Sequence, residues 1–302
     1  MNAVSNVLDL NTDNVPSLSS SAMLVELSIS SWTGRKKDKA ASKKVTDENG
    51  ADAAVASVNK TLLSDCEQLI NIKKYIGEVR NHVHYHLTMP WSDTGIRLLP
   101  TEMFFDYQQR VTHYEGLIAQ EVDSLIDDFE YQKSKAASKL GTLFNADDYP
   151  TAETLRDKFS FRVNYMPLPD AGDFRLDIGN DAVNELQRKY EDMYTSKIEQ
   201  AMQDIWTRVH KSLTAMSSRL GYDDNGKKLI FRDSLIDNAL DMVDVLKKCN
   251  VTGDSQMQIM ADKLEDALRG ITPEGLREDE AYREDTKKSI DELLKTLPSL
   301  DL

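Results

Sequence analysis

The chain has 302 residues, 40% of them hydrophobic and 29% charged, and its 37 Lys and Arg against 51 Asp and Glu give a net charge of −14. This balance is typical of a globular protein of one or two domains, and so acidic a surface disfavours nucleic-acid binding except through a local basic patch. No apolar run is long enough to span a bilayer, and the N-terminal segment lacks the pattern of a signal peptide, so we expect a cytoplasmic protein.

The two cysteines carry no metal-binding pattern. Cys66 and Cys249 lie far apart, and each falls in an apolar helical pattern. We therefore expect free, buried thiols in a reducing compartment.

The N-terminal part changes from a polar tail to a strand and then to a basic segment. Residues 1–21 are rich in Ser and Asn, which predicts a disordered tail. Apolar residues alternate with serines towards Ser30, which predicts a strand over Leu24–Ser30. Ser31–Thr46 then holds six cations and one anion, a net charge of +5 that leaves −19 on the rest of the chain.

Two interpretations of this basic patch, Arg35–Lys44, stay open. It is a solvated helix start or linker that touches the protein's own acidic surface, or it is a contact for nucleic acid or an acidic partner. The candidate contact residues are Trp32, Arg35, Lys36, Lys37 and Lys39.

Two long helices are predicted on either side of a crowded central stretch. Apolar residues recur at intervals of three and four over 51–85, which predicts one amphipathic helix. A second apolar stripe predicts a helix over Thr101–Leu140 that ends at Gly141. We expect the two helices to be antiparallel, with coiled-coil-like packing.

The central stretch, His84–Pro100, is predicted to be a loop. Pro90 and Pro100 do not fit inside a helix, and roughly a dozen residues make a longer link than the 2–8 usual between helices. Ser92–Gly95 predicts a turn. The loop should pack on the core through its apolar side chains, which are Trp91, Leu98 and Leu99.

A small β element is predicted after the second helix. Thr151 is expected to cap a short helix over Ala152–Lys158. Alternation over Phe159–Tyr165 and again over Asp173–Ile178 predicts a hairpin, to which Leu24–Ser30 could add a third strand.

The remaining chain is predicted to be helical. The expected helices are Asp181–Leu220, which Gly221 ends, and then Arg232–Cys249, Ser255–Arg269 and Thr286–Leu297. The fold class is thus mainly α with some β: long antiparallel helices plus a small two- or three-stranded antiparallel sheet. The expected segments are the tail (1–21), an elongated helical body with the β element (22–221) and a C-terminal helical region (222–302).

Chemical motifs are weak. His82, His84 and His86 lack the further ligands of a zinc site, so the favoured interpretation is histidines near a helix end. The sequence has no Gly-rich phosphate loop and no nucleophile elbow, so we predict no enzyme, metal or cofactor. Carboxylates are too abundant for any pair of them to indicate catalysis. The favoured interpretation is structural charge pairs between the central stretch and the hairpin, and the residues concerned are Asp93, Arg97, Asp170, Asp173 and Arg175.

Five stretches of the sequence together carry a resemblance to a known family. They are Leu27–Lys39, His84–Tyr85, Thr88–Pro100, Pro167–Arg175 and Phe231–Leu235. They resemble an uncharacterised family of tailed bacteriophages and prophages, over residues 23–295, with Met89 where the family more often has Leu. The resemblance implies no catalytic residue. Some family members are encoded near MoxR-type ATPases and von Willebrand A-like proteins, which suggests an ATPase-associated role.

Three functional hypotheses follow. The first is a non-enzymatic phage protein in the host cytoplasm that binds a protein partner, either a phage ATPase or a host factor. The second is a nucleic-acid-associated protein of phage DNA metabolism that uses the basic patch. The third is a self-assembling structural protein, a homo-oligomer formed through the long helices.

Overall fold

The computed structural model describes residues 18–169 and 180–298, with side chains omitted for 180–184. Most of the predicted tail and the predicted strand Asp173–Ile178 lie outside these residues, as do the candidate residues Asp170, Asp173 and Arg175. Residues 18–21, which were assigned to the tail, form the short helix α1 (Leu18–Ser21).

The chain divides into two units that do not follow sequence order. Unit 1 comprises the described parts of 1–26, 86–105 and 164–302, and unit 2 comprises 27–85 and 106–163. Four elements contribute residues to both units: β1 (Ala22–Ser30), α4 (Tyr85–Leu87), α5 (Phe104–Asp127) and β6 (Ser160–Pro167).

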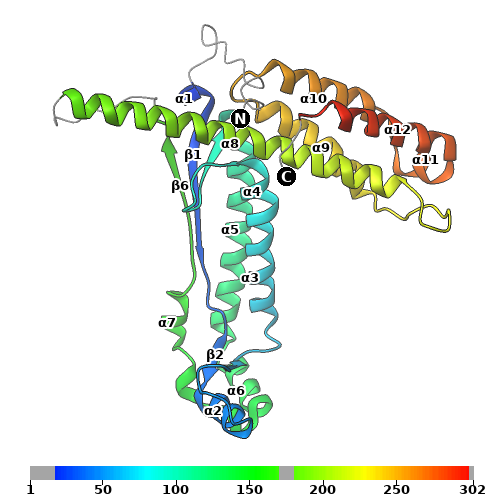
Figure 1. Ribbon diagram of the computed structural model, residues 1–302. Coiled ribbons are helices and arrows are strands. Elements are labelled where there is room, and N and C mark those ends of the chain that lie inside the picture. Colours follow the sequence, from blue (N-terminus) through cyan, green and yellow to red (C-terminus); the bar gives the residue numbers. More distant parts are fainter. Residues whose placement is uncertain (1–17, 170–179, 299–302) are drawn as a thin grey trace. The chain divides into compact units, whose positions relative to one another are not determined.

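Unit 2 is built on two antiparallel helices, as predicted. Helix α3 (Glu67–Glu78) continues as a π-helical turn, Val79–His84, and lies beside α5 (Figure 1). Gln68 donates to Asp128 over 3.2 Å, and Asn71 donates to Glu121 over 2.9 Å. These hydrogen bonds join the first turns of α3 to the C-terminal end of α5, so the two helices run antiparallel.

The predicted helix over 51–85 is wrong in its first half. Residues 51–66 contain loops and the strand β3 (Val58–Thr61), which pairs antiparallel with β2 (Arg35–Asp38). The chain turns from β2 directly into α2 (Lys39–Glu48). Leu62 and Leu63 are buried in a loop, and Val55 is 70% exposed. The spacing of the apolar residues over 51–66 is typical of a helix, but the pairing of β3 with β2 determines the backbone of Val58–Thr61.

The second predicted helix is broken and does not begin at Thr101. Thr101–Met103 is a 3₁₀ turn, α5 ends at Asp127, and α6 (Phe129–Leu140) follows. Gly141 ends α6 with a φ of 54°, as the sequence predicted. The chain continues through 3₁₀ turns at Gly141–Leu143 and Ala146–Asp148 to α7 (Ala152–Arg156), where Thr151 accepts from the Thr154 amide over 3.3 Å.

One apolar core joins these elements of unit 2. Trp32 packs edge-on against the buried Phe129, with ring centroids 5.9 Å apart. The largest part of this core comes from α3, α5 and α6, and its members include Leu69, Ile72, Ile76, Val122, Leu125, Phe129 and Leu155.

The central stretch is a β-hairpin rather than a loop, which corrects the sequence prediction. Short helix α4 (Tyr85–Leu87) leads into β4 (Met89–Pro90), and β5 (Ile96–Pro100) returns antiparallel to it. The turn between them was predicted, and Gly95 has a φ of 96° there. Strand β5 also pairs with the distant β1, from Ala22 opposite Pro100 to Glu26 opposite Ile96.

The main sheet has four strands in the order β4-β5-β1-β6. The predicted strands Leu24–Ser30 and Phe159–Tyr165 are confirmed as β1 and β6. Leu98 and Leu99 are fully buried, as expected, whereas Trp91 is only half-buried. Pro90 lies in an edge strand, where a missing N–H is tolerated.

The helices of unit 1 match their predictions closely. Helix α8 packs against α9 and α12, and α9 packs against α10 (Figure 1). Helix α12 begins six residues before its predicted start, because Asp279 accepts from the Tyr282 amide over 3.0 Å and caps it there. The bounds are α8 Asn180–Leu220, α9 Ser234–Lys248, α10 Ser255–Leu268, α11 Pro273–Glu278 and α12 Glu280–Thr296.

The fold is therefore mainly α with a small antiparallel β element. Among the described residues, no helix has the length and apolar character needed to cross a membrane.

Candidate binding surface

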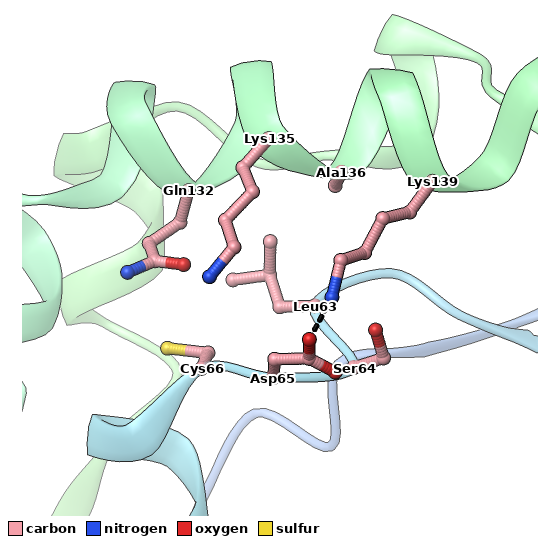
Figure 2. A pocket seen from close by; sticks show the side chains of 8 residues that line it. All are labelled: Leu63, Ser64, Asp65, Cys66, Gln132, Lys135, Ala136 and Lys139. Carbon is pink, nitrogen blue, oxygen red and sulfur yellow. Dashed lines mark ion pairs between the residues drawn. The ribbon is translucent and has the colours of Figure 1, made fainter.

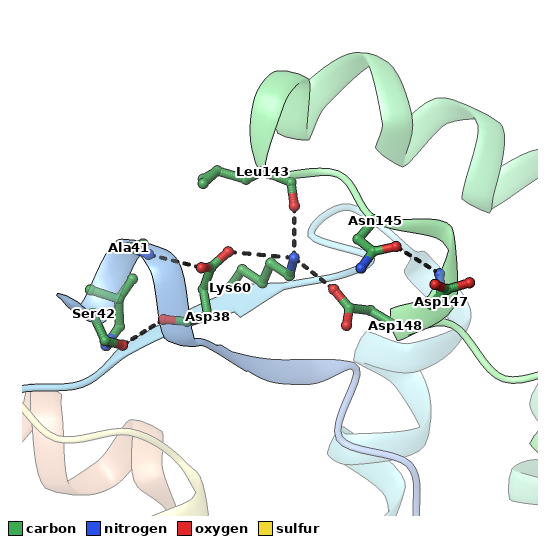
Figure 3. A network of polar contacts seen from close by, with 9 residues as sticks. Asp38, Ala41, Ser42, Lys60, Leu143, Asn145, Asp147 and Asp148 are labelled. Atoms are coloured by element: carbon green, nitrogen blue, oxygen red, sulfur yellow. Dashed lines mark hydrogen bonds and ion pairs between the residues drawn. The ribbon is translucent and has the colours of Figure 1, made fainter. Parts of the chain in front are cut away.

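The basic segment is held in place at the junction of β2 and α2. Asp38, the last residue of β2, accepts from the Ala41 amide over 2.9 Å and so caps α2. The buried Ser42 hydroxyl donates to the Asp38 carbonyl over 2.5 Å and accepts from the Val58 amide over 2.9 Å. This polar junction, drawn in Figure 3, fixes the direction in which the lysines around Asp38 leave the backbone.

Lys60 holds this junction to the segment that follows α6. Its side chain on β3 is 7% exposed, and its ammonium lies 2.6 Å from Asp148 and 3.4 Å from Asp38. It also donates to the Leu143 carbonyl over 2.7 Å (Figure 3). The hydrogen bond to Asp148 raises the pKa of Lys60, so the ammonium stays charged. The Ala41 amide, followed by Lys60, lowers the pKa of Asp38.

A cleft of about 400 Å³ opens beside this network. Lys36, Lys37 and Lys39 line it on the β2–α2 side, and Phe144 and Asn145 line it on the other. A volume in this range suits several groups of a ligand or a few side chains of a partner.

Five cations of the basic segment are exposed, and three of them line the cleft. Arg35, Lys36, Lys37, Lys39 and Lys43 are all exposed, and no ion pair joins them to any carboxylate of residues 18–169 or 180–298. Lys44, by contrast, lies 3.8 Å from Glu48. We call these five residues the basic surface.

Trp32 packs this segment against the core of unit 2. Its ring lies against Phe129, and Gly34 beside it has a φ of 62°. A Cβ at Gly34 would come within 3.2 Å of Leu69, so the chain passes close to α3 there. The aromatic residue of the predicted patch is thus used to anchor the backbone that carries the cations.

The candidate residues of the central stretch fall into two groups. His84 is buried in unit 2, with its Nδ1 2.8 Å from the Tyr107 hydroxyl. Trp91 belongs to unit 1 and packs edge-on against Tyr194 of α8 at 5.6 Å. Asp93 is exposed in the hairpin turn.

Arg97 takes part in a polar cluster that the sequence did not indicate. It donates to the Thr88 hydroxyl over 2.6 Å and to the Thr88 carbonyl over 3.0 Å. Arg208 of α8 donates to the same carbonyl over 2.8 Å and to that of His86 over 3.0 Å. Two guanidinium groups therefore satisfy the backbone carbonyls where α4 ends, which is a structural task.

Neither cysteine has the environment of a reactive thiol. Cys66 precedes the first turn of α3, a position that favours a thiolate, but burial outweighs this effect and raises its pKa. The cavity beside it, drawn in Figure 2, holds about 10 Å³, room for one water molecule at most. Burial raises the pKa of Cys249 to about 12.

A Ser–Lys–Asp contact between α8 and α12 also escaped the sequence analysis. The Lys287 ammonium lies 2.5 Å from Asp291 and 3.3 Å from the Ser217 hydroxyl, which itself donates to Asp291. A lysine must be neutral to take a proton from serine. Because Asp291 stabilises the ammonium, we interpret this trio as a polar link between two helices.

The described residues hold no group of three or more His, Cys, Asp or Glu side chains that could bind a metal ion. No protein-family model, no curated protein and no solved structure matches this chain. The function must therefore be inferred from the surface itself.

Proposed function

We propose that this chain is a non-enzymatic binding protein of a tailed bacteriophage that uses the basic surface to dock an acidic protein partner. The observation that supports the proposal is the group of five exposed cations that no described carboxylate pairs with, in a chain of net charge −14. With 51 acidic residues available, an unpaired cluster of this size indicates a surface kept for another molecule.

The shape of the site supports a protein partner. Lys60 and its two aspartates make a fixed floor, while Lys36, Lys37 and Lys39 are long side chains that adapt to an uneven acidic surface. Leu143 lines the same cleft and is 43% exposed, which adds an apolar contact between the charges.

The kind of partner is taken from the sequence resemblance. The segment Leu27–Lys39, which forms β2 and leads into it, is one of the stretches that resemble the phage family. We propose a phage ATPase or a host factor in the cytoplasm of the infected cell as the partner.

Quantitative affinity purification from infected cells tests this proposal. The tagged chain is compared with a variant that carries Lys36→Glu, Lys37→Glu and Lys39→Glu. The matched control carries Lys211→Glu, Lys263→Glu and Lys288→Glu, three exposed lysines of unit 1 with the same change of charge. We expect an acidic protein to be recovered in stoichiometric amount with the wild type and the control and lost with the first variant.

Two results would contradict the proposal. One is the recovery of no stoichiometric partner, and the other is a partner that the first variant retains as well as the wild type does. Both variants should keep the wild-type circular dichroism spectrum, because all six lysines are exposed.

A second candidate function is nucleic-acid binding through the same surface. It is favoured by the close spacing of Lys36, Lys37 and Lys39 along one wall of the cleft, since lysines bind phosphates as point charges. It is disfavoured because Phe144, the aromatic residue of the cleft, is half-buried against Tyr149 at 5.5 Å and offers no open stacking face. Filter binding at low salt with single- and double-stranded DNA decides: no retention eliminates this candidate.

A further inference from the structure

The connection between α8 and α9 carries a solvent-exposed isoleucine, Ile230. Asp223 accepts from the amides of Asn225 and Lys227 over 3.0 Å and 2.8 Å, and Gly226 has a φ of 74°, so the turn is well defined. A few residues later Ile230 is 84% exposed. A fully exposed isoleucine on a connection fixed by its own hydrogen bonds offers an apolar contact to another molecule.

The next residue anchors this connection to the helices behind it. Phe231 is 7% exposed and contacts two guanidinium groups, with Arg277 at 5.0 Å and Arg283 at 5.3 Å from its ring centroid. Arg283 is itself held by backbone carbonyls, including that of Leu229 at 2.8 Å. The position of Ile230 is thus set by its neighbours on both sides.

A cleft of about 380 Å³ lies against Ile230, and two arginines line it. Arg219, in the last turn of α8, and Arg232, just before α9, are exposed and form no ion pair with any carboxylate in the described part of the chain. Elsewhere in unit 1, Arg208, Arg269 and Arg277 each pair with an aspartate, namely Asp204, Asp266 and Asp233. The two cleft arginines therefore stand out in an acidic chain.

The chemistry of the cleft selects its ligand. A guanidinium group binds a carboxylate through two parallel hydrogen bonds, while Ile230 and Leu235 offer apolar surface beside the arginines. Base stacking has no platform here, because Phe231, the aromatic residue of the cleft, is 7% exposed and lies against two guanidinium groups. A ligand in which a carboxylate adjoins an apolar side chain can pair with the arginines and contact Ile230 and Leu235 at the same time.

We propose that this cleft binds a short acidic peptide segment of a protein partner, in which Asp or Glu adjoins an aliphatic or aromatic side chain. The carboxylate lies between Arg219 and Arg232, and the apolar side chain lies on Ile230. This site uses residues of unit 1 alone, so it stands or falls independently of the basic surface of unit 2.

A peptide array probed with the full chain tests the proposal. The array holds short peptides that combine Leu or Phe with Asp or Glu in every order. Each has a matched peptide with Asn and Gln in place of the acids and another with Ser in place of the apolar residues. We expect retention on a subset of the acidic, apolar peptides, weaker retention on both matched sets, and weakening as salt is raised.

Fluorescence anisotropy with the peptide retained best then assigns the site. Arg219→Glu with Arg232→Glu should raise the Kd at least about ten-fold, and so should Ile230→Ser. The matched controls are Lys211→Glu with Lys288→Glu, and Ile259→Ser, an exposed isoleucine of α10. Both controls should bind as the wild type does.

The proposal is overturned if no peptide retains the chain, if the Asn and Gln peptides bind equally well, or if the cleft variants bind like their controls. A labelled thymidine oligonucleotide is the remaining probe. If it binds the wild type but not the double arginine variant, and no peptide binds, the cleft is a phosphate site and the proposal is overturned. Thermal melts of all variants identify any that fail to fold. If the double arginine variant fails to fold, the comparison of Ile230→Ser with Ile259→Ser still tests the proposal.

Discussion

At the scale of single residues, two buried cations control local order in different ways. Lys60 stays charged among two carboxylates and a carbonyl, whereas the buried Arg283 donates its hydrogen bonds to backbone carbonyls. A buried charge must be matched by partners that replace water. Each of these residues is therefore more important to stability than the exposed cations that surround it.

Lys60→Met is expected to lower the free energy of unfolding by about 2–3 kcal/mol. The substitution keeps an unbranched apolar chain close to the length of the lysine stem but leaves Asp38 and Asp148 without the ammonium between them. Urea denaturation measures the change. Lys74→Met is the control. Lys74 is exposed, and its ion pair with Glu78 is long, at 4.0 Å, so the substitution should change the free energy of unfolding by less than about 0.5 kcal/mol.

Arg283→Met is expected to cost about 3–5 kcal/mol, because its guanidinium satisfies carbonyls at the end of α8. It donates over 2.8 Å to each of the Leu220, Arg219 and Leu229 carbonyls. Arg283→Lys should also be destabilising, since an ammonium cannot reach all three at once. If the lysine variant melts like the wild type, charge alone holds this helix end and the geometric explanation is wrong.

At the scale of elements, most local signals were predicted correctly, apart from α11 and the capped start of α12, and long-range ones were not. The predicted helix Ser255–Arg269 differs from α10 by a single residue, because its cap and apolar stripe lie within the element itself. The strand in residues 51–66 was not predicted, because Lys60 is a lysine at a buried strand position. Its partners, Leu143 and Asp148, lie more than 80 residues away in the sequence.

The same contrast applies to the candidate site. The cations of the basic surface were predictable, because a cluster of lysines in an acidic chain can be read from composition. The central hairpin was not, since β5 lies between β4 and β1, and the residues that pair it with β1 are 70 or more positions away in the sequence. The cleft at Ile230 was missed because nothing in a linear pattern places Arg219 near Arg232 across the end of a helix.

Asp254→Ala tests the cap of α10 and should cost about 1 kcal/mol. The Asp254 carboxylate accepts from the amides of Gln256 and Met257 over 2.7 Å and 3.3 Å, and alanine leaves both without this acceptor. Chemical denaturation measures the loss. Asp254→Ser keeps a capping oxygen and should recover most of the stability; if it is as unstable as the alanine variant, the cap is not the cause.

At the scale of the whole molecule, the distribution of charge predicts how stability depends on pH. Hydrogen bonds from Lys287 and Ser217 lower the pKa of Asp291, and Lys247 lowers the pKa of Glu265. A carboxyl group whose pKa is lower in the folded state stabilises the fold above its unfolded pKa, and this stabilisation is lost as pH falls through the folded value. Acid should therefore weaken the links between helices of unit 1.

We expect the free energy of unfolding to fall as the pH drops below about 4, where the unfolded carboxyl groups begin to bind protons before the folded ones do. Asp291→Asn should reduce this dependence, because it removes one such group between α8 and α12. Urea denaturation between about pH 6 and about pH 3 measures it. Asp285→Asn, at an exposed position of the same helix, is the control, and an equal effect of both substitutions would contradict the argument.

The interleaving of the two units has a consequence for synthesis on the ribosome. Every residue of unit 2 has been made once residue 163 is added, whereas unit 1 needs residues from 164 onwards. Ala22–Glu26 is therefore translated early but must wait for Ile96–Pro100 before its strand is paired. Unit 2 is placed to fold first, while the helices of unit 1 that follow residue 163 are still to be made. A chaperone or a translation pause would act most effectively in that interval.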